Sequence, residues 1–172
     1  MLKIILLGYM GAGKSTIGAF LSEKLELPFF DLDNCLEEQE GVTINSIFET
    51  KGEIYFRKIE HQVLKNFALS ADSFVLSLGG GTPCYANNHL FLKGQGVVSI
   101  YLKTSINELT DRIGKELASR PILAIKKPSE LKEFIAQHLF ERSYYYHHAM
   151  YTVMTDGKSP AELVVEIEGL LA

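Results

Sequence analysis

Residues 8–15 read Gly8-Tyr9-Met10-Gly11-Ala12-Gly13-Lys14-Ser15, which matches the spacing G-x-x-x-x-G-K-[ST] of a phosphate-binding loop. The segment at 3–7, apolar from Ile4 to Leu7, has the length of a buried strand, and apolar residues recur at helical spacing over 17–25. In this context the glycines let backbone N–H groups turn inward around phosphates, and the helix N-terminus favours negative charge. A glycine-rich turn that merely links strand to helix would not explain Lys followed by Ser.

The side chains of this loop predict how a nucleotide would be held. We expect Lys14 to reach the β- and γ-phosphate oxygens of ATP and Ser15 to ligate Mg²⁺. A regulatory GTPase would also need a guanine-reading N-K-x-D segment, and the sequence contains none. The predicted nucleotide-binding residues of the loop are Gly11, Ala12, Gly13, Lys14, Ser15 and Thr16.

The length and composition are those of one globular domain covering residues 1–172. The chain is 47% hydrophobic and 22% charged, and its net charge of -4 argues against a nucleic-acid partner, which would need clustered Lys and Arg. The apolar run Ile4–Leu7, with only Lys3 before it, is too short for a signal peptide or a membrane span. Cys35 and Cys84 lack the spacing of a zinc or redox site. We expect a cytoplasmic monomer with a small-molecule substrate and no membrane or nucleic-acid partner.

The alternation of apolar runs and helical segments predicts the fold class. Short apolar runs alternate with segments of helical period along the chain, as in an α/β fold whose parallel sheet carries helices on both faces. The sequence shows no internal repeat and no low-complexity linker. The predicted strands, five in number, are Lys3–Leu7, Pro28–Asp31, Ser73–Leu78, Val97–Leu102 and Tyr151–Met154.

Two helix starts and one loop can be predicted between the later strands. Ser105 with Glu108, and Ser159 with Glu162, have the spacing of a capping box, which predicts a helix after each serine. By contrast, residues 113–128 show no clean period and contain several glycine, proline and basic residues, so we interpret them as a mobile basic loop.

Arg120 lies within this basic loop. If the loop closed over the site, the guanidinium of Arg120 would come onto the transferring phosphate, where such an arginine stabilises the developing charge. The alternative is an arginine that is merely solvated at the surface. We favour the functional interpretation.

Two carboxylates follow the second predicted strand. Asp31 and Asp33 lie at its carboxyl end, where open α/β sheets bind ligands. Because alternate strand positions point to opposite sides, we expect one carboxylate to hold hydrated Mg²⁺ and the other to accept the proton of an acceptor hydroxyl. The alternative is that they cap the helix that runs through Leu36.

Two arginines are predicted to face inward. Over residues 53–69 the apolar period includes Glu60, and Arg57 lies one turn earlier at its edge. An inward carboxylate needs a partner, so we expect Glu60 to pair with Arg57 and to orient its planar guanidinium toward an anionic acceptor. In the predicted helix from Glu130 onward, Arg142 shares the face of the apolar residues. A self-sufficient ion pair is the alternative for both arginines.

A run of three glycines, Gly79, Gly80 and Gly81, directly follows the third predicted strand. A backbone without side chains at a strand end lets a ligand ring approach the main chain. The strand itself carries Ser77 where many P-loop enzymes have a metal-holding aspartate, so we expect Asp31 to take that part through water.

With these residues assembled, the sequence resembles the shikimate kinase family over nearly its whole length. It departs from the family pattern at Tyr144, where a proline is usual, and at Lys158, where an arginine is frequent. The matching elements are G-Y-M-G-A-G-K-S-T-I-G at 8–18, D-L-D at 31–33, Ile44-x-x-Ile47-Phe48-x-x-x-Gly52-Glu53-x-x-Phe56-Arg57-x-x-Glu60, Gly79-Gly80-Gly81 and Arg120-Pro121-Ile122-Leu123.

The resemblance implies a fold, a reaction and a set of site residues. The fold is an α/β/α sandwich of the nucleoside-monophosphate-kinase type with a five-stranded parallel sheet and a lid at about 113–125. The reaction is the ATP- and Mg²⁺-dependent phosphorylation of the 3-hydroxyl of shikimate, on the route to chorismate and the aromatic amino acids. The implied residues are Lys14, Asp33 and Arg120 for catalysis, Arg112, Arg120 and Lys158 for further nucleotide contacts, Asp33, Arg57, Gly79, Gly80, Gly81, Arg142, Phe48 and Phe56 for the substrate, and Ser15 and Asp31 for the metal.

Two alternatives stay open from the sequence. Another small P-loop kinase, acting on gluconate or a nucleoside monophosphate, would share the phosphate-binding loop. A non-catalytic nucleotide-binding regulator would bind ATP without releasing ADP in the presence of an acceptor.

Overall fold

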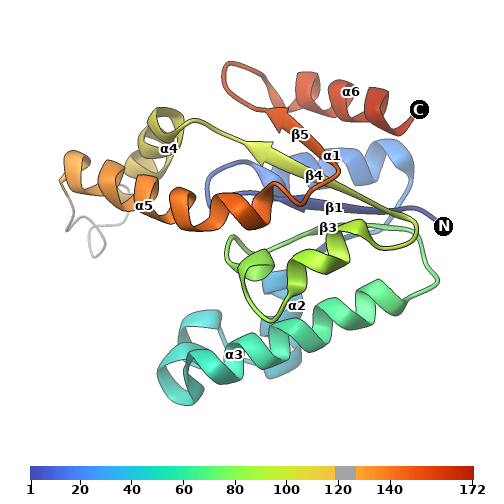
Figure 1. Cartoon of the computed structure of the whole chain (residues 1–172), viewed down its shortest axis with the longest axis horizontal. Coiled ribbons are helices and arrows are strands. Elements are labelled where there is room, and N and C mark those ends of the chain that lie inside the picture. Colours follow the sequence, from blue (N-terminus) through green and yellow to red (C-terminus); the bar gives the residue numbers. More distant parts are fainter. Residues whose placement is uncertain (119–126) are drawn as a thin grey trace.

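The computed structural model describes residues 1–118 and 127–172, which form an α/β fold with helices on both faces of a sheet (Figure 1). The predicted strands are all present, with ends shifted by at most one residue. The elements are β1 (Lys3–Leu7), α1 (Lys14–Leu25), β2 (Phe29–Asp31), α2 (Leu32–Glu40), α3 (Ile44–Leu69), β3 (Phe74–Ser77), the 3₁₀ segments η1 (Thr82–Cys84) and η2 (Asn88–Lys93), β4 (Val97–Lys103), α4 (Ile106–Ala118), α5 (Pro128–Tyr146), β5 (Tyr151–Met154) and α6 (Pro160–Leu171).

The sheet is parallel and, within the described residues, has five strands in the order β2-β3-β1-β4-β5. β1 lies at its centre, paired with β3 on one side and β4 on the other. Because the strands are parallel, their carboxyl ends meet at one edge of the sheet, and the connections that follow β1, β2 and β3 converge there. The fold class predicted from the alternating pattern is confirmed.

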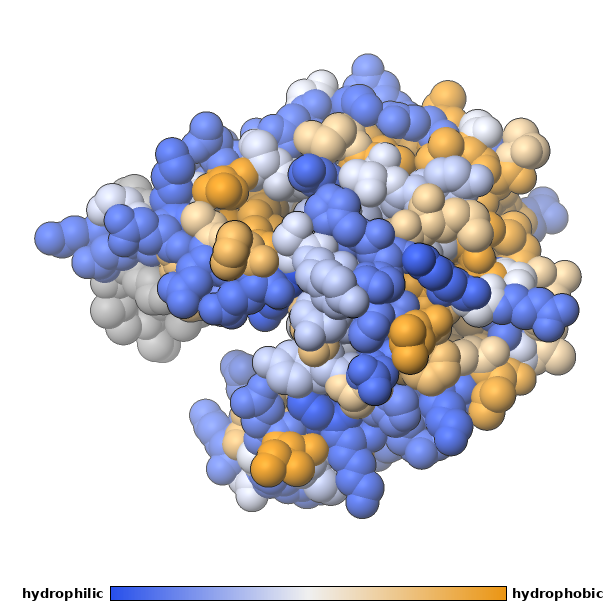
Figure 2. Space-filling view, viewed as in Figure 1, coloured by the Kyte–Doolittle hydropathy of each residue, from blue (hydrophilic) through white to orange (hydrophobic). Residues whose placement is uncertain are grey.

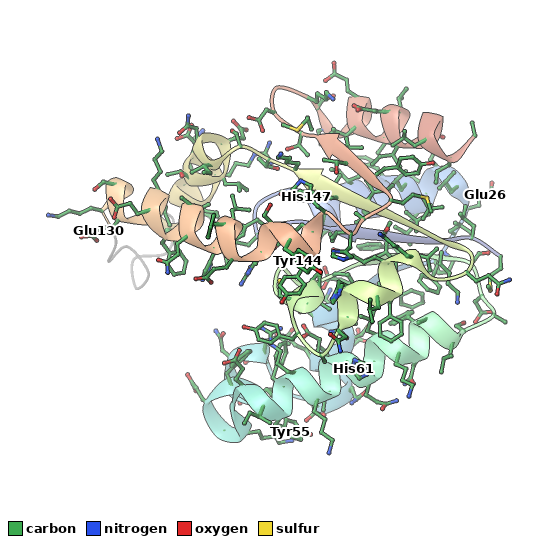
Figure 3. The ribbon with its side chains drawn as sticks, in the orientation of Figure 1. Glu26, Tyr55, His61, Glu130, Tyr144 and His147 are labelled. Atoms are coloured by element: carbon green, nitrogen blue, oxygen red, sulfur yellow. The ribbon has the colours of Figure 1, made fainter. Side chains whose placement is uncertain are left out.

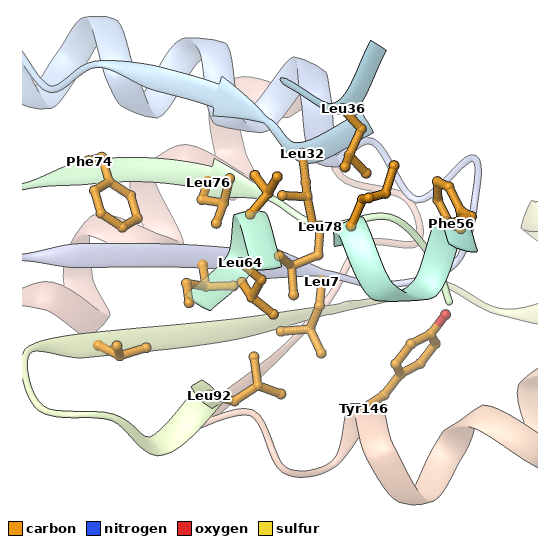
Figure 4. Close-up of a cluster of buried hydrophobic side chains, with 14 of the residues drawn as sticks. Leu7, Leu32, Leu36, Phe56, Leu64, Phe74, Leu76, Leu78, Leu92 and Tyr146 are labelled. Carbon is orange, nitrogen blue, oxygen red and sulfur yellow. The ribbon is translucent and has the colours of Figure 1, made fainter. Parts of the chain in front are cut away.

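The central strand β1 contributes side chains to two separate hydrophobic cores. Ile5 and Leu7 point to the face that α2, α3 and the end of α5 cover, whereas Ile4 and Leu6 point to the face that α1 and α6 cover. Side chains of a strand alternate between faces, and a strand buried on both faces therefore reads as a continuous apolar run. Figure 4 shows the first of these cores, with Tyr146 of α5 at the end that lies nearest the strand termini.

The sequence interpretation was wrong for residues 113–118, which continue α4 rather than starting a loop. Leu109, Ile113 and Leu117 repeat every fourth residue and pack with Leu131 and Ile135 of α5 in a third cluster. A stretch of sequence that is inspected only from Ile113 onward omits Leu109, and the helical period of the apolar residues is then not visible. Residues 119–126, which include most of the predicted lid, lie outside the described residues.

α3 also begins earlier than the apolar period at 53–69 indicates. Thr43 caps its N-terminus by accepting a hydrogen bond from the Ser46 N–H at 3.2 Å. The helix is kinked at Gly52, whose backbone (φ 81°, ψ 171°) is not helical. This kink changes the direction of the part of α3 that carries the residues of the candidate site.

Over the described residues, no helix has the length and apolar character that crossing a bilayer requires.

A substitution at Gly18 tests how closely α1 packs on the sheet. A Cβ at this position would overlap the ring of Phe29, which starts β2. We expect Gly18→Ala to lower the free energy of unfolding by about 1–3 kcal/mol, because overpacking shifts backbone or rotamers. Gly169 in α6 has open space around its Cβ position, so Gly169→Ala is the matched control and raises stability by about 0.5–1 kcal/mol. Urea denaturation of both variants checks this, and equal effects would contradict it.

Candidate active site

The phosphate-binding loop joins β1 to α1 with a backbone that only glycine adopts readily. Gly13 is the residue before α1 and has a left-handed conformation (φ 91°, ψ 17°), with no side chain capping the helix. The first N–H groups of a helix have no intrahelical partner, and here they are available to an anion. Within the loop the side chain of Ala12 is buried, and Thr16 is exposed on the first turn of α1.

Lys14 folds back over this loop. Its Nζ donates hydrogen bonds to the carbonyl oxygens of Gly8 at 2.8 Å and Tyr9 at 3.0 Å. Burial lowers the pKa of Lys14 to about 8, although the carboxylates of Asp31 and Asp33 oppose this shift. The ammonium is therefore still mostly charged at neutral pH, and its two hydrogen bonds hold it against the backbone of the loop.

The carboxylate of Asp31 contacts two elements at once. Its Oδ2 accepts a hydrogen bond from the Ser15 hydroxyl at 2.9 Å, and its Oδ1 accepts from the N–H groups of Asp33 at 3.1 Å and Asn34 at 3.3 Å. The second set makes Asp31 the N-cap of α2. The capping alternative is thus confirmed for Asp31, and its predicted metal role stays a prediction, with the bond to Ser15 placing the two predicted metal ligands in contact.

The position of Asp33 results from the start of α2 and not from the strand alternation that the sequence suggested. Strand alternation does not separate the two aspartates, because the chain turns into α2 at Leu32 and Asp33 lies in the first helical turn. Burial raises the pKa of Asp33 to about 6; the charges of Asp31 and Glu60 add to the rise and Lys14 opposes it. A carboxylate with a pKa near neutrality is well suited to exchange a proton with a bound hydroxyl.

The predicted ion pair between Arg57 and Glu60 is present in α3. Arg57 Nη1 donates to Glu60 Oε1 at 2.8 Å, and Glu60 is only 1% exposed. The other carboxylate oxygen, Oε2, accepts from the hydroxyl of Thr82 at 2.8 Å. The guanidinium carbon of Arg57 also lies 3.8 Å from the ring centroid of Tyr85, a stacking contact that holds its plane.

Arg142 approaches the same region from α5. Its guanidinium carbon lies 5.4 Å from the ring centroid of Tyr9 in the phosphate-binding loop. Tyr146, one turn later, donates its hydroxyl to the carbonyl oxygen of Gly80 at 2.6 Å. Burial raises the pKa of Tyr146 above its usual range, against the lowering effect of Arg142. α5 is therefore tied to the glycine run and presents a cation there.

Each of the three glycines lies against a different predicted site residue. A Cβ on Gly79 would lie 3.0 Å from Asp33, one on Gly80 would lie 3.1 Å from Arg142, and one on Gly81 would lie 2.9 Å from Arg57. The space that a Cβ would take at each glycine is bordered closely by one of the protein's own charged side chains. That the glycines leave room for a ligand ring stays a prediction.

The surface around these residues is hollowed. A pocket of about 240 Å³ is bounded by the phosphate-binding loop, Asp31, Asp33, Ser77 and residues 78–80. Figure 2 shows the face of the molecule indented between α5 and the N-terminal part of α3. Phe48 and Phe56 stack in that part of α3, with ring centroids 4.6 Å apart.

The predicted nucleotide contacts outside the loop lie farther along the same edge of the sheet. Arg112 of α4 donates from Nη1 to the Gly11 carbonyl oxygen at 3.0 Å and pairs with Glu108, so it is joined to the phosphate-binding loop. Lys158, in the turn after β5, pairs with Glu166 of α6 at 2.6 Å. Arg120 lies outside the described residues.

Sequence reasoning missed Thr82, Tyr85 and Tyr146, which hold the arginines or the glycine run. Two of them follow the glycines within four residues, and this proximity was the available signal. Tyr146 could be found only through its spacing of four from Arg142 on α5. These side chains hold Arg57, Arg142 and the glycine run near the half-buried Asp33 and the phosphate-binding loop, an arrangement that suits transfer of a phosphoryl group to an anionic alcohol.

Comparisons with known proteins agree on one family. A family model described as shikimate kinase matches residues 10–171. The chain is 53% identical to the shikimate kinase of Flavobacterium psychrophilum over 171 residues, covering 99% of each, and 49% identical to that of Flavobacterium johnsoniae over the whole of both chains.

Solved structures give the same result. A crystal structure of shikimate kinase from Bacteroides thetaiotaomicron matches with a TM-score of 0.87 at 33% identity, covering 99% of this chain and 98% of that one. The shikimate kinase of Acinetobacter baumannii in complex with shikimate matches with a TM-score of 0.85 at 34% identity, covering 99% and 93%. A gluconokinase from Sinorhizobium meliloti, at a TM-score of 0.59 and 20% identity, shares the fold alone.

The raised pKa of Asp33 predicts a pH-dependent effect on stability. Between the ordinary Asp pKa of about 4 and the folded value of about 6, the folded protein keeps a proton that the unfolded chain has lost, so this site costs stability as pH rises through that window. We expect Asp33→Asn to raise the free energy of unfolding at pH 7 but not at pH 4. Urea denaturation at both pH values measures this, with exposed Asp111→Asn as the control; a difference independent of pH would contradict it.

Proposed function

The chain belongs to the shikimate kinase family, and we propose that it carries out the family reaction through the residues gathered at the carboxyl edge of its sheet. It transfers the γ-phosphoryl group of ATP to the 3-hydroxyl of shikimate, giving shikimate 3-phosphate and ADP, in aromatic amino acid biosynthesis. The observation that carries the residue assignment is the meeting of Asp33, Arg57 and Arg142 along the glycine run, beside the phosphate-binding loop.

We assign the acceptor to the region where these three residues meet the glycine run, beside the pocket that Asp33, Gly79 and Gly80 help to line. Arg57 and Arg142 hold its carboxylate, and the planar fork of Arg57, fixed by Glu60 and stacked on Tyr85, is suited to a two-point grip. Asp33 binds the ring hydroxyls and takes the proton of the attacking one. The backbone of residues 79–81 contacts the ring, and the stacked Phe48 and Phe56 form its outer wall.

We assign the phosphates of ATP to the loop. The N–H groups from Gly11 to Thr16 and the side chain of Lys14 would hold these phosphates, and Arg112 would contribute on the adenosine side. Support comes from the N-terminus of α1, which no side chain caps, and from the contact of Arg112 with the loop. We retain the predictions that Lys158 lies near the adenine and that Arg120 reaches the transferring phosphate from the lid.

Ser15 and Asp31 fit a magnesium ion that arrives with ATP. A hydroxyl and a carboxylate oxygen 2.9 Å apart are the hard donors that Mg²⁺ prefers, and this ion usually takes one or two protein oxygens with phosphates and water completing its shell. When bound, the ion neutralises charge on the β- and γ-phosphates. The residues themselves fix where it would lie, because Asp31 is held by the N–H groups of α2.

We further propose that residues 1–172 act as one domain and as a cytoplasmic monomer. The phosphate-binding loop and the acceptor residues come from a single chain, so catalysis does not require a partner subunit. The use of ATP and the two free thiols, Cys35 and Cys84, support an intracellular, reducing location.

The central test is transfer itself, measured by coupling ADP release to NADH oxidation. Wild-type protein is expected to release ADP with shikimate, and not with gluconate or nucleoside monophosphates. Asp33→Ala is expected to lower kcat by about 10²–10⁴-fold because the proton acceptor is lost, while the Kd for ATP stays unchanged. Turnover only with gluconate or a monophosphate would refute the function, and full activity of Asp33→Ala would refute the role of that carboxylate.

Arg57→Lys tests the two-point grip on the carboxylate. A lysine keeps the charge but loses the planar fork, so we expect KM for shikimate to rise about 10–100-fold with KM for ATP unchanged. Arg112→Lys is the reciprocal control, and its effect should fall on KM for ATP. Steady-state kinetics with each substrate varied in turn separates the two, and an unchanged KM for shikimate in Arg57→Lys would count against the assignment.

A further inference from the structure

A chain of buried hydrogen bonds runs behind the acceptor pocket. It begins at His61 of α3, whose Nδ1 lies 2.7 Å from Asn88 Oδ1, and continues from Asn88 Nδ2 to the carbonyl oxygen of Thr82 at 2.9 Å. The hydroxyl of Thr82 then reaches Glu60 at 2.8 Å, and Glu60 pairs with Arg57 at 2.8 Å. Figure 3 shows His61 pointing from α3 toward the 3₁₀ segment η2 that carries Asn88.

The donors and acceptors of this chain are determined at every step. The amide nitrogen of Asn88 donates to a carbonyl, so its Oδ1 is the acceptor for His61, whose proton must be on Nδ1. The Thr82 hydroxyl donates to Glu60, because an ionised carboxylate can only accept. Each oxygen of Glu60 therefore has one donor: Arg57 on Oε1 and Thr82 on Oε2.

We propose that Thr82 is a positioning residue for recognition of the acceptor's carboxylate, acting through Glu60 on Arg57 and held in place by Asn88. This inference deepens the proposed function and rests on it. Thr82 is fully buried, and a Cβ on Gly79 would lie 2.9 Å from its hydroxyl oxygen, so the first glycine of the run is what lets that hydroxyl reach Glu60.

The energetic argument concerns Glu60. This carboxylate is 1% exposed, and a buried charged group that loses a hydrogen-bond donor must find another or move. Without the Thr82 hydroxyl, Oε2 faces an apolar side chain, and the carboxylate gains by rotating toward the remaining donor, Arg57. That rotation turns the guanidinium away from Gly81, against which it now lies. The consequence falls on the acceptor subsite, not on the phosphate-binding loop.

The test deletes the hydroxyl and asks which substrate is affected. Thr82→Val removes the hydroxyl at nearly constant shape, Thr82→Ser retains it, and Ser99→Ala deletes a different buried hydroxyl, bonded to the Leu92 carbonyl oxygen at 2.6 Å and remote from the pocket. Thr82→Ala supplies the same deletion should the valine variant fail to fold. Each protein is assayed with shikimate and with its analogue in which a carboxamide replaces the carboxylate.

We expect Thr82→Val to raise KM for shikimate about tenfold while leaving KM for ATP unchanged, and Thr82→Ser to restore most of the affinity. The penalty for replacing the carboxylate by the carboxamide should be smaller in Thr82→Val than in wild type, because the grip on the carboxylate is already impaired. Ser99→Ala should lower stability with neither KM changed.

Three results would overturn the positioning role: an unchanged KM for shikimate in Thr82→Val, equal weakening of both substrates, or an undiminished carboxamide penalty. These outcomes require that the wild type phosphorylate shikimate. Wild-type protein that ignores shikimate instead overturns the proposed function and this inference with it, so the two failures are distinguishable.

Discussion

The narrow strip of backbone at residues 79–81 is the constraint on which the rest of the site depends. Side chains from three helices, Asp33 of α2, Arg57 of α3 and Arg142 of α5, each lie so close to one glycine of this strip that a Cβ there would press on them. The strip continues β3, next to the central strand that leads into the phosphate-binding loop. The sheet thus fixes the distance between the phosphate cradle and the charged groups that face it.

Much of this arrangement follows from local sequence. The phosphate-binding loop, the strands and the parallel sheet follow from motif spacing and from the length of apolar runs, because both are short-range properties of the chain. The pair of Arg57 and Glu60 could also be predicted, since residues three apart on a helix are neighbours and a carboxylate within an apolar stripe requires a partner. Their roles in binding and catalysis remain predictions that the kinetics above address.

The features that the sequence did not predict share one cause: each is determined by tertiary contacts. Residues 113–118 are helical because Ile113 and Leu117 bury against α5, a partner that a local window cannot reveal. Thr82 contacts Glu60 across 22 residues, and Tyr146 contacts Gly80 across 66. The sequence marks these residues only by their closeness to the glycine run and to Arg142, and it does not reveal their partners, because each contact depends on how the sheet brings two elements together.

Asp31 shows how tightly such a site restricts amino-acid change. One of its oxygens caps α2 and the other meets Ser15, so a single carboxylate serves both the local fold and the phosphate side of the pocket. Asparagine would retain the capping oxygen but lose the charge, and glutamate would retain the charge but is a poor N-cap. Each of these two replacements keeps one property and loses the other, so the two requirements together leave aspartate as the side chain that satisfies both, and each requirement closes the substitution that the other would allow.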